Sequence, residues 1–128
     1  MVCARFANLT HGFAACALAV ASAAAAAAPA IGRYDAQLCV STSAAVPSCG
    51  AAEVDWRRAS RARVRIIDFS YRLQFHSNQV AVVLMHGAMQ VDEFVAPFEW
   101  VGNTLQFADA ARGARYELRL GERKGTRP

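Results

Sequence analysis

Residues 98–107 read FEWVGNTLQF, and this segment predicts a β-hairpin. Apolar residues recur on both sides of Gly102-Asn103, a dipeptide that favours a tight turn between two antiparallel strands. Pro97 precedes the hairpin and lacks a backbone donor, so we expect an edge strand or a break at that position. The segment therefore indicates an antiparallel β protein.

Period-two alternation recurs on both sides of this hairpin, as half-buried strands require. Residues 71–76 place Tyr, Leu and Phe on one face and Arg, Gln and His on the other, and residues 116–120 alternate in the same way. Residues 80–85 are continuously apolar, which predicts a central strand covered on both faces. Further strands are expected over residues 33–40 and 63–66.

The remaining segments leave little room for helices. Ile67 breaks the alternation of the strand before it, which indicates a bulge or bend. Residues 51–58 are the only candidate helix, and a short one. The chain therefore predicts an all-β, mainly antiparallel fold of six to eight short strands, arranged as a small sandwich or a barrel-like meander.

Length and composition agree with one domain. The chain has 128 residues, too few for two domains of ordinary size. We expect the β-rich domain to cover residues 31–121 and to be followed by a charged, flexible tail over residues 122–128. The chain lacks the cysteine and glycine motifs of iron–sulfur, P-loop and Rossmann proteins, which argues against those classes.

Residues 1–30 have the layout of a cleaved secretory signal peptide. Arg5 is the only Lys or Arg in this segment, residues 13–28 are uncharged and rich in alanine, and Ala28-Pro29-Ala30 fits the small-residue pattern for cleavage before Ile31. A retained transmembrane helix is the alternative, but about 17 apolar or small positions lie at the lower limit for crossing a bilayer. Because poly-alanine fits a GC-rich bacterial genome, we expect a periplasmic or secreted protein that meets the membrane only through its signal.

Cys39 and Cys49 are the two cysteines of the expected mature chain. An even number of cysteines in an exported domain indicates a disulfide. Their spacing, without a nearby histidine, is poor for zinc and differs from the C-x-x-C of redox proteins. We therefore predict a structural disulfide, which stabilises the fold by about 2–3 kcal/mol.

A run of basic residues with one tryptophan is the first candidate binding site. Its members are Trp56, Arg57, Arg58, Arg61, Arg63 and Arg65. On a strand, the last three arginines share one face, where guanidinium groups bind phosphate or carboxylate groups bidentately. The alternative is a solvated face partly paired with nearby carboxylates, and Trp56 is either an exposed anchor or a buried core residue.

Met85, His86 and Met89 form a second candidate site, because thioether and imidazole ligands select Cu(I). On a regular strand, however, His86 points away from the face that the two methionines share. Methionine in an apolar run more often fills the core, so this metal site is an alternative to the leading interpretation.

No motif indicates catalysis. His76 and His86 are the only histidines of the expected mature chain, and no serine lies in a G-x-S-x-G elbow. We therefore expect a non-enzymatic binding protein without a cofactor, which engages an anionic ligand or a protein partner in the cell envelope through its arginines. Nucleic acid is not an expected partner, because the mature chain is exported and its net charge of +3 is small. The alternatives are an inhibitor of an exported hydrolase such as lysozyme and a periplasmic copper-binding protein.

Overall fold

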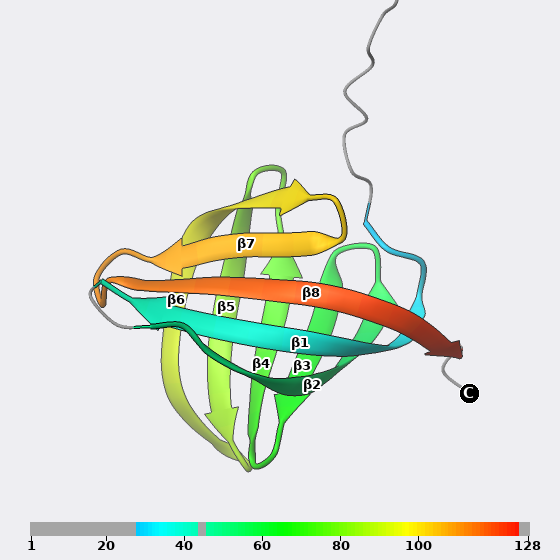
Figure 1. Cartoon of the computed structure of the whole chain (residues 1–128), viewed down its shortest axis with the longest axis horizontal. Coiled ribbons are helices and arrows are strands. Elements are labelled where there is room, and N and C mark those ends of the chain that lie inside the picture. Colours follow the sequence, from blue (N-terminus) through cyan, green and yellow to red (C-terminus); the bar gives the residue numbers. More distant parts are fainter. Residues whose placement is uncertain (1–27, 44–45, 126–128) are drawn as a thin grey trace, which may run out of the picture.

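The computed structural model describes residues 28–43 and 46–125, which form eight antiparallel strands closed into a barrel (Figure 1). Each strand pairs with the next one along the chain, and β1 pairs with β8. The strands are β1 (Gly32–Thr42), β2 (Ser48–Arg58), β3 (Arg61–Ile66), β4 (Phe69–Phe75), β5 (Gln79–His86), β6 (Met89–Val101), β7 (Thr104–Asp109) and β8 (Ala114–Gly125). The all-β prediction is confirmed, and the barrel is the alternative that the structure adopts. The signal peptide prediction concerns residues 1–30, most of which lie outside the described residues.

The hairpin at Gly102-Asn103 forms as predicted. Phe98 pairs with Phe107 and Val101 pairs with Thr104 on either side of the turn. Gly102 has a φ of 63°, a left-handed conformation that glycine adopts without steric cost. Asn103 is also tied to β8, because its side-chain amide donates to the carbonyl oxygen of Leu120 at 2.7 Å and its own carbonyl accepts from the Leu120 amide at 3.0 Å.

Pro97 marks the point at which β6 changes partners. Residues 89–97 pair with β5, and residues 98–101 pair with β7. Where β6 and β7 diverge, Arg112 of the turn before β8 bridges them, with its Nε 3.1 Å from Asp92 and 3.7 Å from Asp109. The expected break therefore appears as a change of partner within one continuous strand.

Three local predictions are wrong. Residues 51–58 belong to β2, and the described residues contain no helix and so none able to span a membrane. Residues 122–125 continue β8 and pair in part with β1, so the flexible tail does not begin at residue 122. Residues 80–85 are not fully covered on both faces: Val80 and Val82 are buried on the barrel side, whereas of the residues in the outward phase Met85 is buried and Ala81 and Val83 are only half-buried.

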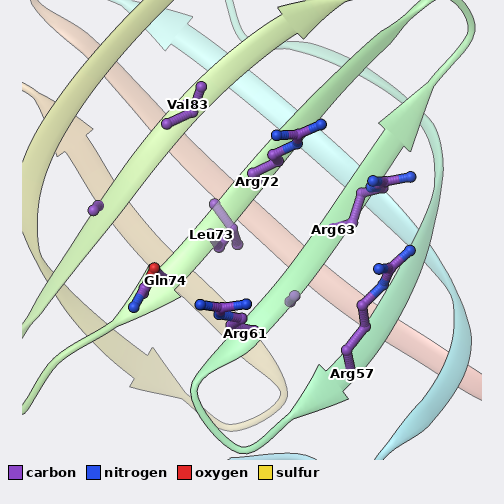
Figure 2. A pocket seen from close by; sticks show the side chains of 9 residues that line it. Arg57, Arg61, Arg63, Arg72, Leu73, Gln74 and Val83 are labelled. Carbon is purple, nitrogen blue, oxygen red and sulfur yellow. The ribbon is translucent and has the colours of Figure 1, made fainter. Parts of the chain in front are cut away.

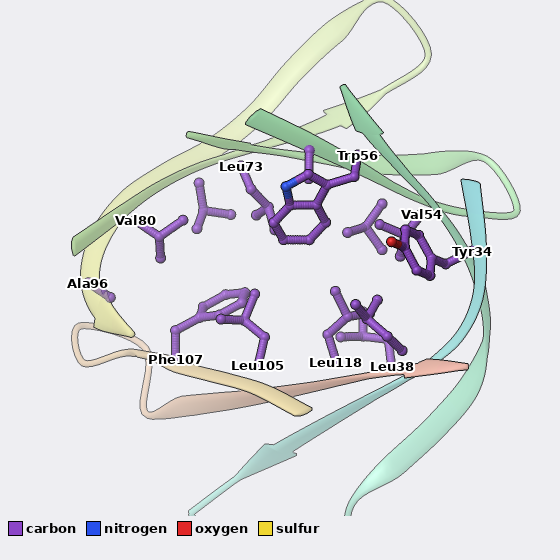
Figure 3. Packing of buried hydrophobic residues seen from close by; sticks show 14 residues of the cluster. Tyr34, Leu38, Val54, Trp56, Leu73, Val80, Ala96, Leu105, Phe107 and Leu118 are labelled. Carbon is purple, nitrogen blue, oxygen red and sulfur yellow. The ribbon is translucent and has the colours of Figure 1, made fainter. Parts of the chain in front are cut away.

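The interior of the barrel is filled by side chains (Figure 3). Val54 and Trp56 of β2 meet Leu105 of β7 and Leu118 of β8 there, each at most 1% exposed. Trp56 stacks on Phe75 with ring centroids 5.5 Å apart. A cavity among Leu38, Phe107 and their neighbours measures about 10 Å³, at or below the space that one water needs. This cavity has no room for a ligand.

Two features secure β1 to its neighbours. Cys39 of β1 lies opposite Cys49 of β2 and is bonded to it, with Cα atoms 4.0 Å apart, so the predicted disulfide is confirmed. At the start of β1, a Cβ on Gly32 would lie 2.7 Å from the carbonyl oxygen of Gly125, which is too close for any larger residue. The first and last strands are therefore in direct contact where the barrel closes.

Candidate functional site

The outer surface of β2–β5 is hollowed, and the hollow of about 500 Å³ is surrounded by arginines (Figure 2). Arg57 comes from β2, Arg61 and Arg63 from β3, and Arg72 from β4, and their side chains lie on the same side of the sheet. The other lining residues are Ala62, Leu73, Gln74, Ala81 and Val83. We call these four arginines the arginine face; none of the lining residues is acidic.

Strand phase explains why these side chains meet. Val64 of β3 and Leu73 of β4 point into the barrel and are 2% exposed, so the residues on either side of them point outward. Arg63 lies directly opposite Arg72, and Arg61 lies directly opposite Gln74. At the β2–β3 turn, Arg58 lies opposite Arg61. Two pairs of like charges thus stand across adjacent strands, an arrangement that destabilises a sheet.

Carboxylates of β2 neutralise part of this surface. Arg57 Nε lies 3.3 Å from Asp55, and Arg65 Nη2 lies 3.0 Å from Glu53. Both acidic residues are on β2, where Asp55 lies directly opposite Arg63 and Glu53 directly opposite Arg65, and β3 separates them from Arg72. The β4 side of the hollow therefore keeps an excess of positive charge.

The titration of Arg63 reflects this crowding. Burial lowers the pKa of Arg63, and the neighbouring charges of Arg57 and Arg72 lower it further, whereas Asp55 acts in the opposite direction. An arginine stays protonated at neutral pH even when its pKa is lowered. The guanidinium group of Arg63 is therefore a cation in an unfavourable position, and an anion in the hollow would relieve the repulsion.

The structure brings together only part of the site predicted from the sequence. Arg57, Arg61 and Arg63 line the hollow, Arg65 points outward beyond it toward Glu53, and Arg58 lies at the turn. Trp56 is 1% exposed inside the barrel, so the prediction of an exposed anchor is wrong. Its position on the inner face follows from the alternation of β2, which places its neighbours Arg57 and Asp55 outside.

Arg72 is the member of the arginine face that sequence reasoning missed. The signal for it is present in the turn between β3 and β4, which consists of Ile67 and Asp68. A two-residue turn at these positions pairs Ile66 with Phe69. Counting back three residues on each strand places Arg63 opposite Arg72. A hairpin register drawn from the turn would have joined the two arginines.

The residues of the second candidate site do not share one face of the sheet. Met85 pairs with Gln90 and is 7% exposed, whereas the next residue, His86, pairs with Met89 at the exposed end of the β5–β6 hairpin, so that Met85 points to the opposite face. His86 stacks on Phe69, with ring centroids 4.6 Å apart. Among the described residues, no group of three or more His, Cys, Asp and Glu side chains could hold a metal ion.

The two histidines lie at opposite ends of β5. His76 is in the turn before the strand, where its amide donates to the carbonyl oxygen of Gln79 at 2.8 Å, and His86 is the last residue of the strand. The structure therefore does not bring them together in one site.

Comparison of the chain with protein-family models, curated proteins and solved structures gives no match.

Proposed function

We propose that this chain is an exported, non-enzymatic binding protein that engages an anionic partner through the arginine face. One observation carries the proposal: Arg63 and Arg72 stand directly opposite each other beside a hollow that no carboxylate lines. The fold accepts this repulsion on its outer surface, where other residues would be tolerated. Natural proteins break such local rules mainly at functional sites.

The chemistry of the hollow favours an anion with more than one oxygen. A guanidinium group offers a planar fork of donors that matches phosphate or carboxylate, and several forks around one hollow bind such a group from different sides. The cavity described among Leu38, Phe107 and their neighbours is too small for a ligand, which favours a site on the outer surface. The proposal therefore rests on the outer face of the sheet.

Export is the second part of the proposal. The bonded Cys39–Cys49 pair is compatible with an oxidising compartment, and the sequence of residues 1–30 supports a secretory signal. The mass of the protein recovered from bacterial periplasm or culture medium tests this part. A chain that begins at Ile31 is expected, and an uncleaved chain confined to the cytoplasm would contradict it.

Thermal unfolding of the oxidised protein tests the binding proposal, with heparin and inorganic phosphate as the anionic probes. A probe present at about 100 times its dissociation constant stabilises a protein by roughly 2.7 kcal/mol, which raises the unfolding midpoint of a domain of this size by roughly ten degrees. We expect this shift to fall as salt is added and to disappear in the double variant Arg63→Ser, Arg72→Ser.

The matched control is the double variant Arg115→Ser, Arg119→Ser. Both arginines are exposed on β8, across the barrel from β3 and β4 (Figure 1). This control removes the same charge and should keep the shift. Equal loss in both variants would mean that only net charge matters and would overturn the proposal. Cu(I) and lysozyme in the same panel test the two alternative functions.

A further inference from the structure

The hollow has a second side whose chemistry differs from the arginine face. Ala81 and Val83 of β5 line it opposite the arginines, and both are half-buried on the outer surface. In the ladder between β4 and β5, Arg72 pairs with Val83 and Gln74 pairs with Ala81. The cationic side chains of β4 therefore lie directly beside the aliphatic side chains of β5.

The aliphatic row continues onto β6. Val95 lies directly opposite Ala81, and its side chain is 60% exposed on the outer surface. Directly opposed residues have Cβ atoms about 4.5–5.5 Å apart, and diagonal neighbours are also within reach. Ala81, Val83 and Val95 consequently form one patch, which we call the aliphatic strip.

A carboxylate next to the aliphatic strip favours one orientation of a bound anion. Glu93 of β6 lies directly opposite Val83, so a carboxylate stands on the side of the strip away from the arginines. A negative group on a ligand is attracted toward β3 and β4 and repelled from β6. A bound molecule would therefore place its charged end over the arginine face and its uncharged part over the strip.

The residues that line the hollow narrow the class of ligand further. A volume of about 500 Å³ is in the range of small-molecule sites. None of the lining residues is aromatic, so the hollow lacks the platform on which nucleobases stack. Alanine and valine side chains offer no hydrogen bonds and suit a hydrocarbon chain.

We infer that the hollow binds a single amphiphilic anion, with a phosphate or carboxylate head on the arginine face and an aliphatic chain over the aliphatic strip. This inference rests on the proposed function and adds the class of ligand. It differs from binding of a polyanion, which needs the arginines only. It also differs from adsorption to a bilayer, which needs a surface of many lipids.

Calorimetry with the oxidised protein and three soluble probes tests the inference. The probes are dihexanoyl phosphatidylglycerol below its micelle concentration, glycerol phosphate, and dihexanoyl phosphatidylcholine. We expect the first to bind at least about tenfold more tightly than the other two, because it alone combines the anionic head with chains. Vesicles of long-chain phosphatidylglycerol form a fourth arm, which tests the bilayer source.

The double variant Val83→Thr, Val95→Thr keeps the shape and the strand propensity of both residues but makes the strip polar. It should weaken binding of dihexanoyl phosphatidylglycerol by roughly five- to tenfold and leave binding of glycerol phosphate unchanged. Val101→Thr is the matched control, since Val101 is 52% exposed on the same strand as Val95 but pairs with Thr104 of β7 and not with the β5 residues that line the hollow. This control should bind every probe as the unaltered protein does.

The outcomes separate the inference from the proposed function. If glycerol phosphate binds as tightly as the chain-bearing anion, or if only vesicles bind, the amphiphile inference is overturned. The proposed function still stands in the first case, provided that Arg63→Ser, Arg72→Ser weakens binding. If that double variant leaves the binding of all anionic probes unchanged, the proposed function itself is overturned.

Discussion

Arg63 of β3 and Arg72 of β4 face each other directly across an antiparallel ladder, on the outer surface of the barrel. Each lies beside a buried residue that fixes its direction, since Val64 and Leu73 point inward. Neither arginine can turn away without breaking the alternation of its strand. The pair therefore lowers the stability of the barrel while it provides two cations for anion binding.

Arg72→Glu should stabilise the barrel while weakening anion binding. The substitution replaces a repulsive cross-strand pair by an attractive one, which is worth about 0.5–1 kcal/mol at low salt. Urea unfolding at low and at high salt measures the gain, which should shrink as salt screens the pair. Arg115→Glu, on β8, is the control and should give no such gain. A less stable Arg72→Glu protein would contradict the prediction.

Ile67→Gly should also raise stability. Ile67 occupies the first position of the two-residue turn between β3 and β4 with a φ of 51°, and its side chain is 93% exposed. A left-handed conformation costs a β-branched residue about 1–2 kcal/mol, and hairpin turns favour glycine there. Because glycine costs entropy on folding, the expected net gain in unfolding free energy is about 0.5–1 kcal/mol. Ile67→Val keeps the strain and should show no gain.

Tyr116 should make the barrel sensitive to alkaline pH. Burial, followed by the nearby Tyr71 and Asp109, raises the pKa of Tyr116 from 10.0 to about 12. The unfolded chain loses the phenolic proton first, so this contribution to stability is complete below pH 10 and is lost as pH rises to about 12. Unfolding followed by circular dichroism across this range should show the decline. In Tyr116→Phe the decline should be smaller, and an unchanged profile would refute the assignment.

Reduction of the Cys39–Cys49 disulfide should weaken the barrel without unfolding it. The bond joins residues ten apart in the sequence, and such a short loop gives about 2–3 kcal/mol of stabilisation. The β1–β2 ladder that flanks the bond remains after reduction, so the strands should stay paired. Urea unfolding with and without a reductant measures the loss, and Cys39→Ser, Cys49→Ser should reproduce it. A reduced protein that is already unfolded in buffer would contradict this view.

Local patterns predicted the strands well where the turn residues are unambiguous. Gly102-Asn103 gave the correct hairpin, and residues 33–40 and 63–66 lie within strands. Residues 51–58 failed because their start, Ala-Ala-Glu, suits a helix by intrinsic propensity. Pairing of β2 with β1 and β3 outweighs that propensity, and the alternation of the strand decides between the two predictions for Trp56 in favour of a buried core residue.

Closure of the barrel could not be predicted from local sequence patterns. The choice between a sandwich and a barrel depends on whether β1 pairs with β8, and these strands are separated by most of the domain. The arginine face was recognised on β2 and β3, but its β4 member was missed because the cross-strand register was not drawn. The aliphatic strip was missed because residues 80–85 were expected to be covered on both faces.

The contact between Gly32 and Gly125 brings the two ends of the barrel domain together, so the strands could be connected in another order. Since every strand neighbours the next and the last neighbours the first, the strands form a ring in which no position is topologically special. A short linker from residue 125 to residue 32 and a new opening in the turn at Ser77 and Asn78 would give a circular permutant with the same ring of strands. All four residues of the arginine face would then lie on the second segment of the permuted chain, whereas Ala81 and Val83 would lie on the first. The hollow would thus be formed by the same strands after a complete relocation of the chain ends.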